Sequence, residues 1–208
     1  MIPAHAHASQ VRYPDVAGVV LAGGESLRMG RDKALMLIRG QTLVERLADR
    51  LREVTDLVYI SANEPLRYSF LGLPVIPDLF PGTGPLAGIH AVLLHSPRPW
   101  LLVLACDLPA VSVTFLHRLI ASSNGYDGVI PATSDGFPHP VCALYHRNCL
   151  SHIDRSLRVG ECGILRVLEK SGLQIRRLAS PEGRFADSEL IDLDSPEDCE
   201  NYLRLLNS

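Results

Sequence analysis

The chain has 208 residues, of which 47% are hydrophobic and 21% are charged, and 20 basic against 23 acidic residues give a net charge of −3. This length suffices for one substantial core, and the charge balance argues against a basic surface that binds nucleic acid. The sequence has no apolar run of about 18 residues that could cross a membrane and no signal-like start. We therefore expect a cytoplasmic protein without membrane contacts.

Residues 1–15 show no periodicity, and we expect them to form a flexible tail in front of a single domain at 16–208. The domain contains five cysteines without a C-x-x-C pair. An odd number of cysteines without such a pair argues against a disulfide framework and against a zinc site, so we expect free, buried thiols.

Short apolar runs alternate with segments of helical periodicity, which is typical of βαβ units. Strands are expected at 16–21, 57–61, 75–76, 101–106, 126–131 and 141–145. Helices are expected at 42–54, 88–94 and 113–122, as a pair within 150–168, and from the N-cap Ser195 to Leu206. The predicted fold is an α/β, three-layer α/β/α Rossmann-like sandwich with a mostly parallel central sheet, in which ligands bind beyond the carboxyl ends of the strands.

The first expected strand leads into a glycine loop, Leu21-Ala-Gly-Gly-Glu-Ser-Leu-Arg-Met-Gly-Arg-Asp-Lys33. Gly23 and Gly24 have no side chain and adopt backbone angles that other residues avoid, so their N–H groups can approach phosphate oxygens closely. Arg28 and Lys33 add positive charge. Because the spacing matches neither the P-loop nor the G-x-G-x-x-G pattern, it predicts a nucleotide-binding loop of another type.

Asp107 directly follows the expected strand 101–106, so its carboxylate would emerge at the same edge of the sheet as the glycine loop. Proteins usually hold Mg²⁺ with one or two carboxylates together with phosphates and waters. The position therefore predicts a Mg²⁺ ligand for a bound nucleoside triphosphate. The alternative is that Asp107, next to Leu108-Pro109, only caps a turn or a helix.

The glycine loop resembles the signature L-A-G-G-x-S-x-R-M-G-x-D-K of the molybdenum cofactor guanylyltransferases, nucleotidyltransferases of GT-A-like fold that transfer GMP from GTP to molybdopterin and release pyrophosphate. Cys106-Asp107-Leu108-Pro109 matches the family's C-D-x-P segment, whose aspartate binds Mg²⁺ and nucleotide. The resemblance extends from residue 17 to about 205. It implies that Arg28, Lys33 and Asp107 are catalytic. The nucleotide-binding residues that it implies are Leu21, Ala22, Gly23, Gly24, Lys33, Asn63, Asp78, Gly84, Pro85, Leu86 and Asp107.

Two of these assignments have simpler alternatives. Asn63 stands where the family has an asparagine that touches the nucleotide, but it could merely end a strand. Residues 82–88 resemble the G-P-L-A-G block, with Asp78 upstream, but could form a plain rigid turn. An Asn amide can both donate to and accept from a base or ribose, and guanine offers such an edge.

The resemblance places the acceptor site in the second half of the chain. Residues 136–145 resemble the acceptor-side segment, in which His139 could contact the pterin phosphate, with a surface turn as the alternative. Asp192 and Asp194 replace the two asparagines of the guanylyltransferase motif N-x-N-T-P-x-D, a form closer to the cytidylyltransferases of the superfamily. Carboxylates there could supply a further Mg²⁺ ligand, but they would repel an acceptor phosphate in the absence of a metal.

We therefore expect a Mg²⁺-dependent enzyme that transfers GMP from GTP to molybdopterin, with Lys33 and Arg28 near the phosphates. A CTP-dependent molybdopterin cytidylyltransferase, or transfer to another phosphorylated acceptor, is the first alternative. A regulatory module that only binds nucleotide is the second. The resemblance also implies transient contacts with molybdenum-cofactor insertion and delivery proteins, for a monomer or weak oligomer.

Overall fold

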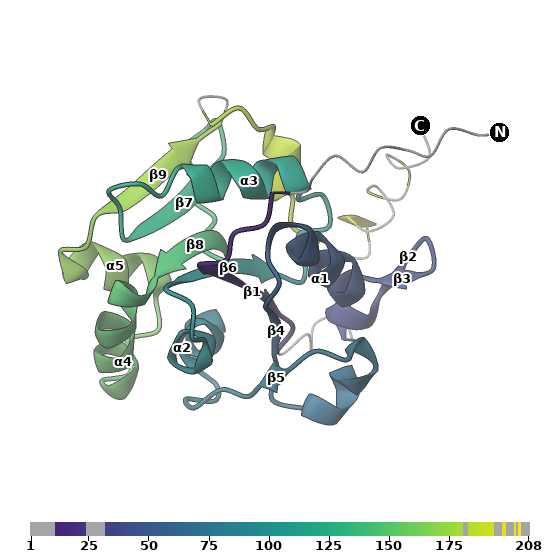
Figure 1. Ribbon diagram of the computed structural model, residues 1–208, viewed down its shortest axis with the longest axis horizontal. Coiled ribbons are helices and arrows are strands. Elements are labelled where there is room, and N and C mark those ends of the chain that lie inside the picture. Colours follow the sequence, from purple (N-terminus) through teal and green to yellow (C-terminus); the bar gives the residue numbers. More distant parts are fainter. Residues whose placement is uncertain are drawn as a thin grey trace.

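The computed structural model describes residues 11–23, 32–180, 183–193, 197–198, 202 and 204. Its centre is a seven-stranded sheet with the strand order β5-β4-β1-β6-β8-β7-β9 (Figure 1). Strand β8 runs antiparallel to both of its neighbours, whereas the other neighbouring pairs are parallel. The strands are β1 (Val16–Leu21), β4 (Val58–Ser61), β5 (Val75–Ile76), β6 (Trp100–Ala105), β7 (Gly128–Ala132), β8 (Cys142–His146) and β9 (Ile175–Ala179).

Helices cover both faces of this sheet, which makes three layers (Figure 1). One face packs against α1 (Leu43–Val54) and α3 (Val113–Ala121). The other face packs against α2 (Pro85–His95), α4 (Leu150–Arg158) and α5 (Ile164–Ser171). The predicted α/β sandwich with a mostly parallel sheet is confirmed.

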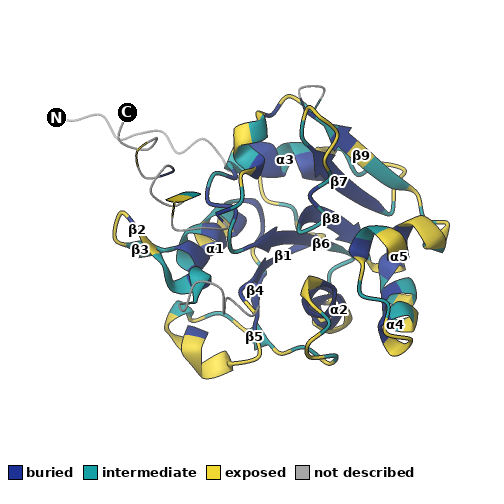
Figure 2. Cartoon of the chain, turned by 180° about the vertical axis from the view of Figure 1, so that it is seen from behind, coloured by how far each residue is buried: buried dark blue, intermediate teal, exposed yellow. Residues whose placement is uncertain are grey.

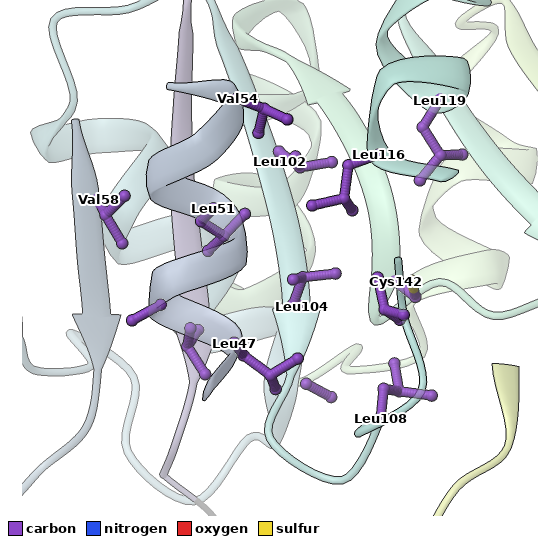
Figure 3. Close-up of a cluster of buried hydrophobic side chains, with 14 of the residues drawn as sticks. Leu47, Leu51, Val54, Val58, Leu102, Leu104, Leu108, Leu116, Leu119 and Cys142 are labelled. Atoms are coloured by element: carbon purple, nitrogen blue, oxygen red, sulfur yellow. The ribbon is translucent and has the colours of Figure 1, made fainter. Parts of the chain in front are cut away.

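Alternate residues of each strand supply the two cores, because successive strand side chains point to opposite faces. Val16 and Val20 belong to the core under α1 and α3, whereas Ala17, Val19 and Leu21 belong to the core under α2. Figure 3 shows leucines of α1 and α3 gathered around Leu102 and Leu104 of β6. The inner strands are buried and the edge strands β5 and β9 are only partly so, while the outer surfaces of α4 and α5 are exposed (Figure 2).

Helix α1 shows how local sequence specifies these elements. Thr42 caps its N-terminus, and a reciprocal capping box joins Thr42 to Glu45, which satisfies two backbone donors of the first turn. Helix α2 has no polar face, because it is enclosed between the sheet and α4, and its residues from Leu86 to Leu93 are all buried. It begins earlier than the expected 88–94, with Pro85 in its first turn.

Other predicted elements agree to within a few residues, and two additions were not predicted. These are the edge strand β9 and a short hairpin of β2 (Leu37–Ile38) and β3 (Gln41–Thr42). The expected closing helix lies largely outside the described residues, of which 197, 198, 202 and 204 are helical. Within the described residues, no helix is long and apolar enough to cross a membrane.

The end of the expected N-terminal tail contacts the domain. The backbone N–H of Tyr13 donates to Val54 at 2.8 Å, and Asp15 accepts from the N–H of Trp100 at 3.1 Å. Among the cysteines that the structure describes, Cys142 and Cys149 are buried free thiols as predicted, whereas Cys106 and Cys162 are partly buried.

Candidate active site

The carboxyl ends of three neighbouring strands define the site. Leu21, the last residue of β1, pairs with Ser61 at the end of β4 and with Ala105 at the end of β6. The segments that follow these strands therefore leave the sheet side by side. They carry Gly23, Asn63 and Asp107, so the structure brings together residues that the sequence places more than eighty positions apart.

The glycine loop begins in close contact with β4. The N–H groups of Ala22 and Gly23 both donate to the Ser61 carbonyl at 3.0 Å. A Cβ on Gly23 would lie 3.3 Å from Ala62 Cα, so a glycine lets the two backbones approach here. The side chains of Leu21 and Ala22 are buried in the cores, which leaves their backbone as the part able to meet a nucleotide. Gly24, Arg28 and Asp194 lie outside the described residues.

Lys33 and Asp107 come together beside the thiol of Cys106. Burial, together with the negative charges of Asp107 and Asp32, raises the pKa of the Cys106 thiol to about 12, and the positive charge of Lys33 opposes this rise. Lys33 starts a 3₁₀ helix, Lys33–Leu35, whose N-cap is Asp32. The charges of Lys33 and Asp107, two of the predicted catalytic residues, thus both act on the Cys106 thiol at the strand ends, and this thiol stays protonated near neutral pH.

Asp107 also meets the C-terminal segment. The N–H of Leu193 donates to the Asp107 carbonyl at 2.9 Å, and the Oδ1 atom of Asp107 is buried. Burial raises the pKa of the Cys142 thiol, and the charges of Asp192, Glu189 and Asp107 raise it further, so these carboxylates lie around the start of β8. The backbone at residues 192–193 therefore passes Asp107. In the described ranges, no group of three or more His, Cys, Asp or Glu side chains could hold a metal by itself.

Asn63 and Asp78 form a reciprocal pair at the ends of β4 and β5. Asn63 Nδ2 donates to Asp78 Oδ2 at 3.0 Å, and Asn63 Oδ1 accepts from the Asp78 backbone N–H at 2.8 Å. Partial burial raises the pKa of Asp78, while hydrogen bonds with Asn63 and Ser61 act against the rise. The pair presents a carboxylate and an amide at one edge of the site.

Helix α2 points its N-terminus at the same edge of the sheet. Gly84 caps it with φ = 72°, a left-handed angle that favours glycine, and Pro85 follows in the first turn. The side chain of Leu86 is buried in the core, so any nucleotide contact here uses the backbone. The first N–H groups of a helix carry a partial positive charge that favours phosphate.

His139 lies between β7 and β8 and is 6% exposed, so it is not on an exposed surface turn. Its N–H donates to the Pro131 carbonyl at 2.9 Å, and the Phe137 ring packs edge-on against it. Burial lowers the pKa of His139, which favours the neutral imidazole. Two residues after His139, the Val141 carbonyl accepts a hydrogen bond from the N–H of Ala105, at the end of β6, at 2.8 Å.

Sequence reasoning missed Tyr68 and Ser61. The Tyr68 hydroxyl lies 3.0 Å from the Ala22 carbonyl and 2.8 Å from Asp32 Oδ2. Ser61 is the last residue of β4. Its carbonyl accepts from the N–H groups at the start of the glycine loop, and its side chain is hydrogen-bonded to Asp78. Neither residue type is diagnostic in sequence, because both contacts join segments that only the fold brings together.

The sheet order, the glycine loop after β1, and Lys33 and Asp107 at its edge are those of a nucleotidyltransferase-type α/β domain. Comparison with known proteins agrees, since a family model described as "MobA-like NTP transferase domain" matches residues 18–175. The chain belongs to this family and is a nucleotidyltransferase.

Similar proteins include a probable molybdenum cofactor guanylyltransferase of Pelotomaculum thermopropionicum, 37% identical over 174 residues that cover 81% of this chain and 84% of the relative. A crystal structure of molybdopterin-guanine dinucleotide biosynthesis protein A from Archaeoglobus fulgidus has a TM-score of 0.78 at 24% identity, covering 92% of this chain and 98% of that one. A Mycobacterium tuberculosis protein in complex with manganese has a TM-score of 0.68 at 20% identity, covering 91% and 98%. At these identities, the two structures show the fold.

Proposed function

We propose that this protein transfers GMP from GTP to molybdopterin and releases pyrophosphate. The single observation that carries the proposal is that the charges of Lys33 and Asp107 both act on the Cys106 thiol, at the strand edge where the glycine loop begins. The names of curated relatives supply the acceptor and the nucleotide, because they are molybdenum cofactor guanylyltransferases with 30–38% identity.

The donor set fits a magnesium ion. Asp107 and Asp192 offer hard carboxylate oxygens whose charges both act on the Cys142 thiol, and Mg²⁺ is commonly bound by one or two carboxylates completed by phosphates and waters. Bound there, Mg²⁺ would neutralise triphosphate charge and polarise the α-phosphoryl group. A related fold was crystallised with manganese, which prefers the same oxygen ligands.

The remaining groups of the chain position the reactants. The backbone N–H groups of the glycine loop and Lys33 would hold the phosphates, and Arg28 would add charge beside them. A terminal phosphate oxygen of molybdopterin would attack the α-phosphorus, forming one P–O bond as the bond to the β-phosphate breaks and pyrophosphate leaves. This chemistry needs positioning and charge neutralisation and no protein nucleophile.

The Asn63–Asp78 pair supports GTP over CTP. An ionised carboxylate only accepts hydrogen bonds, and the Watson–Crick edge of guanine presents two adjacent N–H donors beside its carbonyl. Cytosine presents one amino donor beside two acceptors, which would face Asp78 unfavourably. We infer that Asp78 accepts from guanine, and that Asn63 holds the carboxylate in place through its amide donor at 3.0 Å.

The acceptor would enter over β6 and β8. His139, neutral because of its burial, is a donor or acceptor for the pterin phosphate, and Asp192 and Asp194 would face that phosphate through the metal. Transient contacts with cofactor-insertion and delivery proteins would follow from this product.

The test is pyrophosphate release by purified protein with Mg²⁺, molybdopterin and molybdate, with GTP and CTP in parallel. Release with GTP is expected, with loss of at least about 100-fold in Lys33→Ala, the scale of one preorganised electrostatic donor. Release with CTP alone would show a cytidylyltransferase. Nucleotide binding without pyrophosphate release, whichever acceptor is supplied, would show that the protein is a module that only binds nucleotide.

A further inference from the structure

A single buried hydroxyl joins the two ends of the glycine loop. Tyr68 lies in the 3₁₀ helix Pro65–Leu71, which follows β4, and its side chain is 2% exposed. Its hydroxyl is within hydrogen-bond distance of the Ala22 carbonyl, at 3.0 Å, and of Asp32 Oδ2, at 2.8 Å. Ala22 lies where the loop begins and Asp32 where it ends, so this one hydroxyl contacts two positions that are ten residues apart in sequence.

Both oxygens of the Asp32 carboxylate accept hydrogen bonds from the protein. Its Oδ1 atom accepts from the Ala34 N–H at 3.0 Å, and its Oδ2 atom accepts from the Tyr68 hydroxyl and from Arg67 Nη1, the latter at 3.2 Å. These bonds hold the turn that leads to Lys33, the next residue. The segment after β4 thus holds the loop exit through Tyr68 and Arg67.

The same segment holds the loop entrance. The Ser61 carbonyl at the end of β4 accepts from the N–H groups of Ala22 and Gly23, and seven residues later Tyr68 reaches back to the Ala22 carbonyl. Burial raises the pKa of Tyr68 well above its ordinary value, and Asp32 raises it further, so the hydroxyl keeps its proton near neutral pH and can donate it in a hydrogen bond.

We propose that the Tyr68 hydroxyl is a positioning group of the nucleotide site, which acts through Asp32 to set Lys33 against the phosphates. This inference rests on the proposed nucleotide chemistry, because it assigns to Lys33 the phosphate contact. The aromatic ring packs in the core under α1, and a phenylalanine would fill the same space. The hydroxyl is therefore the part with the positioning role.

Tyr68→Phe tests the proposal, with Tyr59→Phe as its matched control. Tyr59 also lies buried in this part of the chain, in β4, and its hydroxyl bonds Ser96 just after the last turn of α2, away from the glycine loop. Tyr68→Phe removes the hydroxyl contacts with Ala22 and Asp32, and Tyr59→Phe removes the contact with Ser96. Both variants should lose stability in urea denaturation, and Tyr68→Phe should lose more because one of its partners is charged.

Affinity for GTP and CTP is measured by titration calorimetry with Mg²⁺ for the wild type, both variants, Lys33→Ala and the double variant Tyr68→Phe/Lys33→Ala. Tyr68→Phe should weaken binding of the preferred triphosphate by about tenfold, as expected for a lost bond to a charged group, and Tyr59→Phe by less than about twofold. Because Tyr68 acts through Lys33, the double variant should bind as Lys33→Ala does.

Equal affinity of Tyr68→Phe and wild type, or additive losses in the double variant, would overturn the inference. The ratio of the variant's affinity to that of the wild type tests the role of Tyr68, whichever triphosphate binds. The affinities of the wild type for GTP and CTP test the proposed nucleotide. A wild type that binds neither triphosphate would overturn both.

Discussion

Gly88 sets how closely α2 approaches the end of β4, and we predict that Gly88→Ala damages stability and nucleotide binding together. A Cβ at this position would lie 2.3 Å from Ser61 Oγ and 3.2 Å from Leu21 Cδ2. Ser61 is 3% exposed, so it has no open space to enter. The added methyl would turn the Ser61 hydroxyl away and break its hydrogen bond to Asp78.

The size of the effect follows from two opposing terms. Overpacking a well-filled core costs about 1–3 kcal/mol. Alanine favours an α-helix over glycine by about 1 kcal/mol. The net loss in the free energy of unfolding should therefore be about 0–2 kcal/mol, measured by urea denaturation followed by circular dichroism. GTP affinity should fall as well, since Asp78 loses one of the two side chains that hold it.

The control removes Ser61 Oγ, the atom closest to a Cβ at position 88. Ser61→Ala alone should lose the Asp78 hydrogen bond, and adding Gly88→Ala to it should then cost less than about 0.5 kcal/mol more, because the closest contact is gone. If Gly88→Ala alone is as stable as the wild type and binds GTP equally well, or if the two substitutions are additive, the close approach of α2 does not have the role given to it here.

Three further predictions concern groups around the site. Arg50 donates to the carbonyls of Pro109 and Val111, so Arg50→Met should lower the free energy of unfolding by about 1–3 kcal/mol, and an unchanged urea midpoint would contradict this. Burial lowers the pKa of His139, so on acidification the imidazole takes up a proton in the unfolded chain before it does so in the folded protein. The free energy of unfolding should therefore fall as the pH drops below about 6.5. In His139→Gln, the urea midpoint should fall less steeply across this pH range. Because the pKa of the Cys106 thiol is raised to about 12, iodoacetamide at about pH 8 should label Cys162 first, and equal labelling of both in peptide mass spectrometry would be the contrary result.

The apolar strands could be predicted from sequence because burial on both faces leaves a distinct pattern. β1 and β6 are unbroken apolar runs that end at polar or turn-forming residues. β9 has no such pattern, since Arg176 and Arg177 interrupt it, and it is an edge strand that pairs with β7 in the described part of the chain. The antiparallel direction of β8 could not be predicted either, because direction depends on the path of the chain and not on local periodicity.

The site was predictable where it depends on residues that follow strands, and not where it depends on the fold. Asp107 and Asn63 each come within two residues of a strand end, so the topology alone directs them to one edge. Tyr68 gives no such signal. Its hydroxyl partners are 46 and 36 positions away in sequence, and its 3₁₀ helix has neither strand nor α-helix periodicity.

The arrangement also bears on the departure at Asp192 from the guanylyltransferase motif. The charges of Asp192 and Asp107 both act on the Cys142 thiol at the start of β8, whereas the Asn63–Asp78 pair lies at the ends of β4 and β5, with β1 and β6 between them in the sheet. A change from asparagine to aspartate at position 192 therefore adds negative charge on the side that would hold the metal and the acceptor. It leaves the edge that would read the base unchanged. We infer that this part of the motif reports how the acceptor phosphate is neutralised and not which nucleotide is used.

An Asp192→Asn variant should thus alter the Mg²⁺ concentration needed for half-maximal turnover, while the preference between GTP and CTP stays as in the wild type. A reversal of that preference would show that the C-terminal segment selects the base.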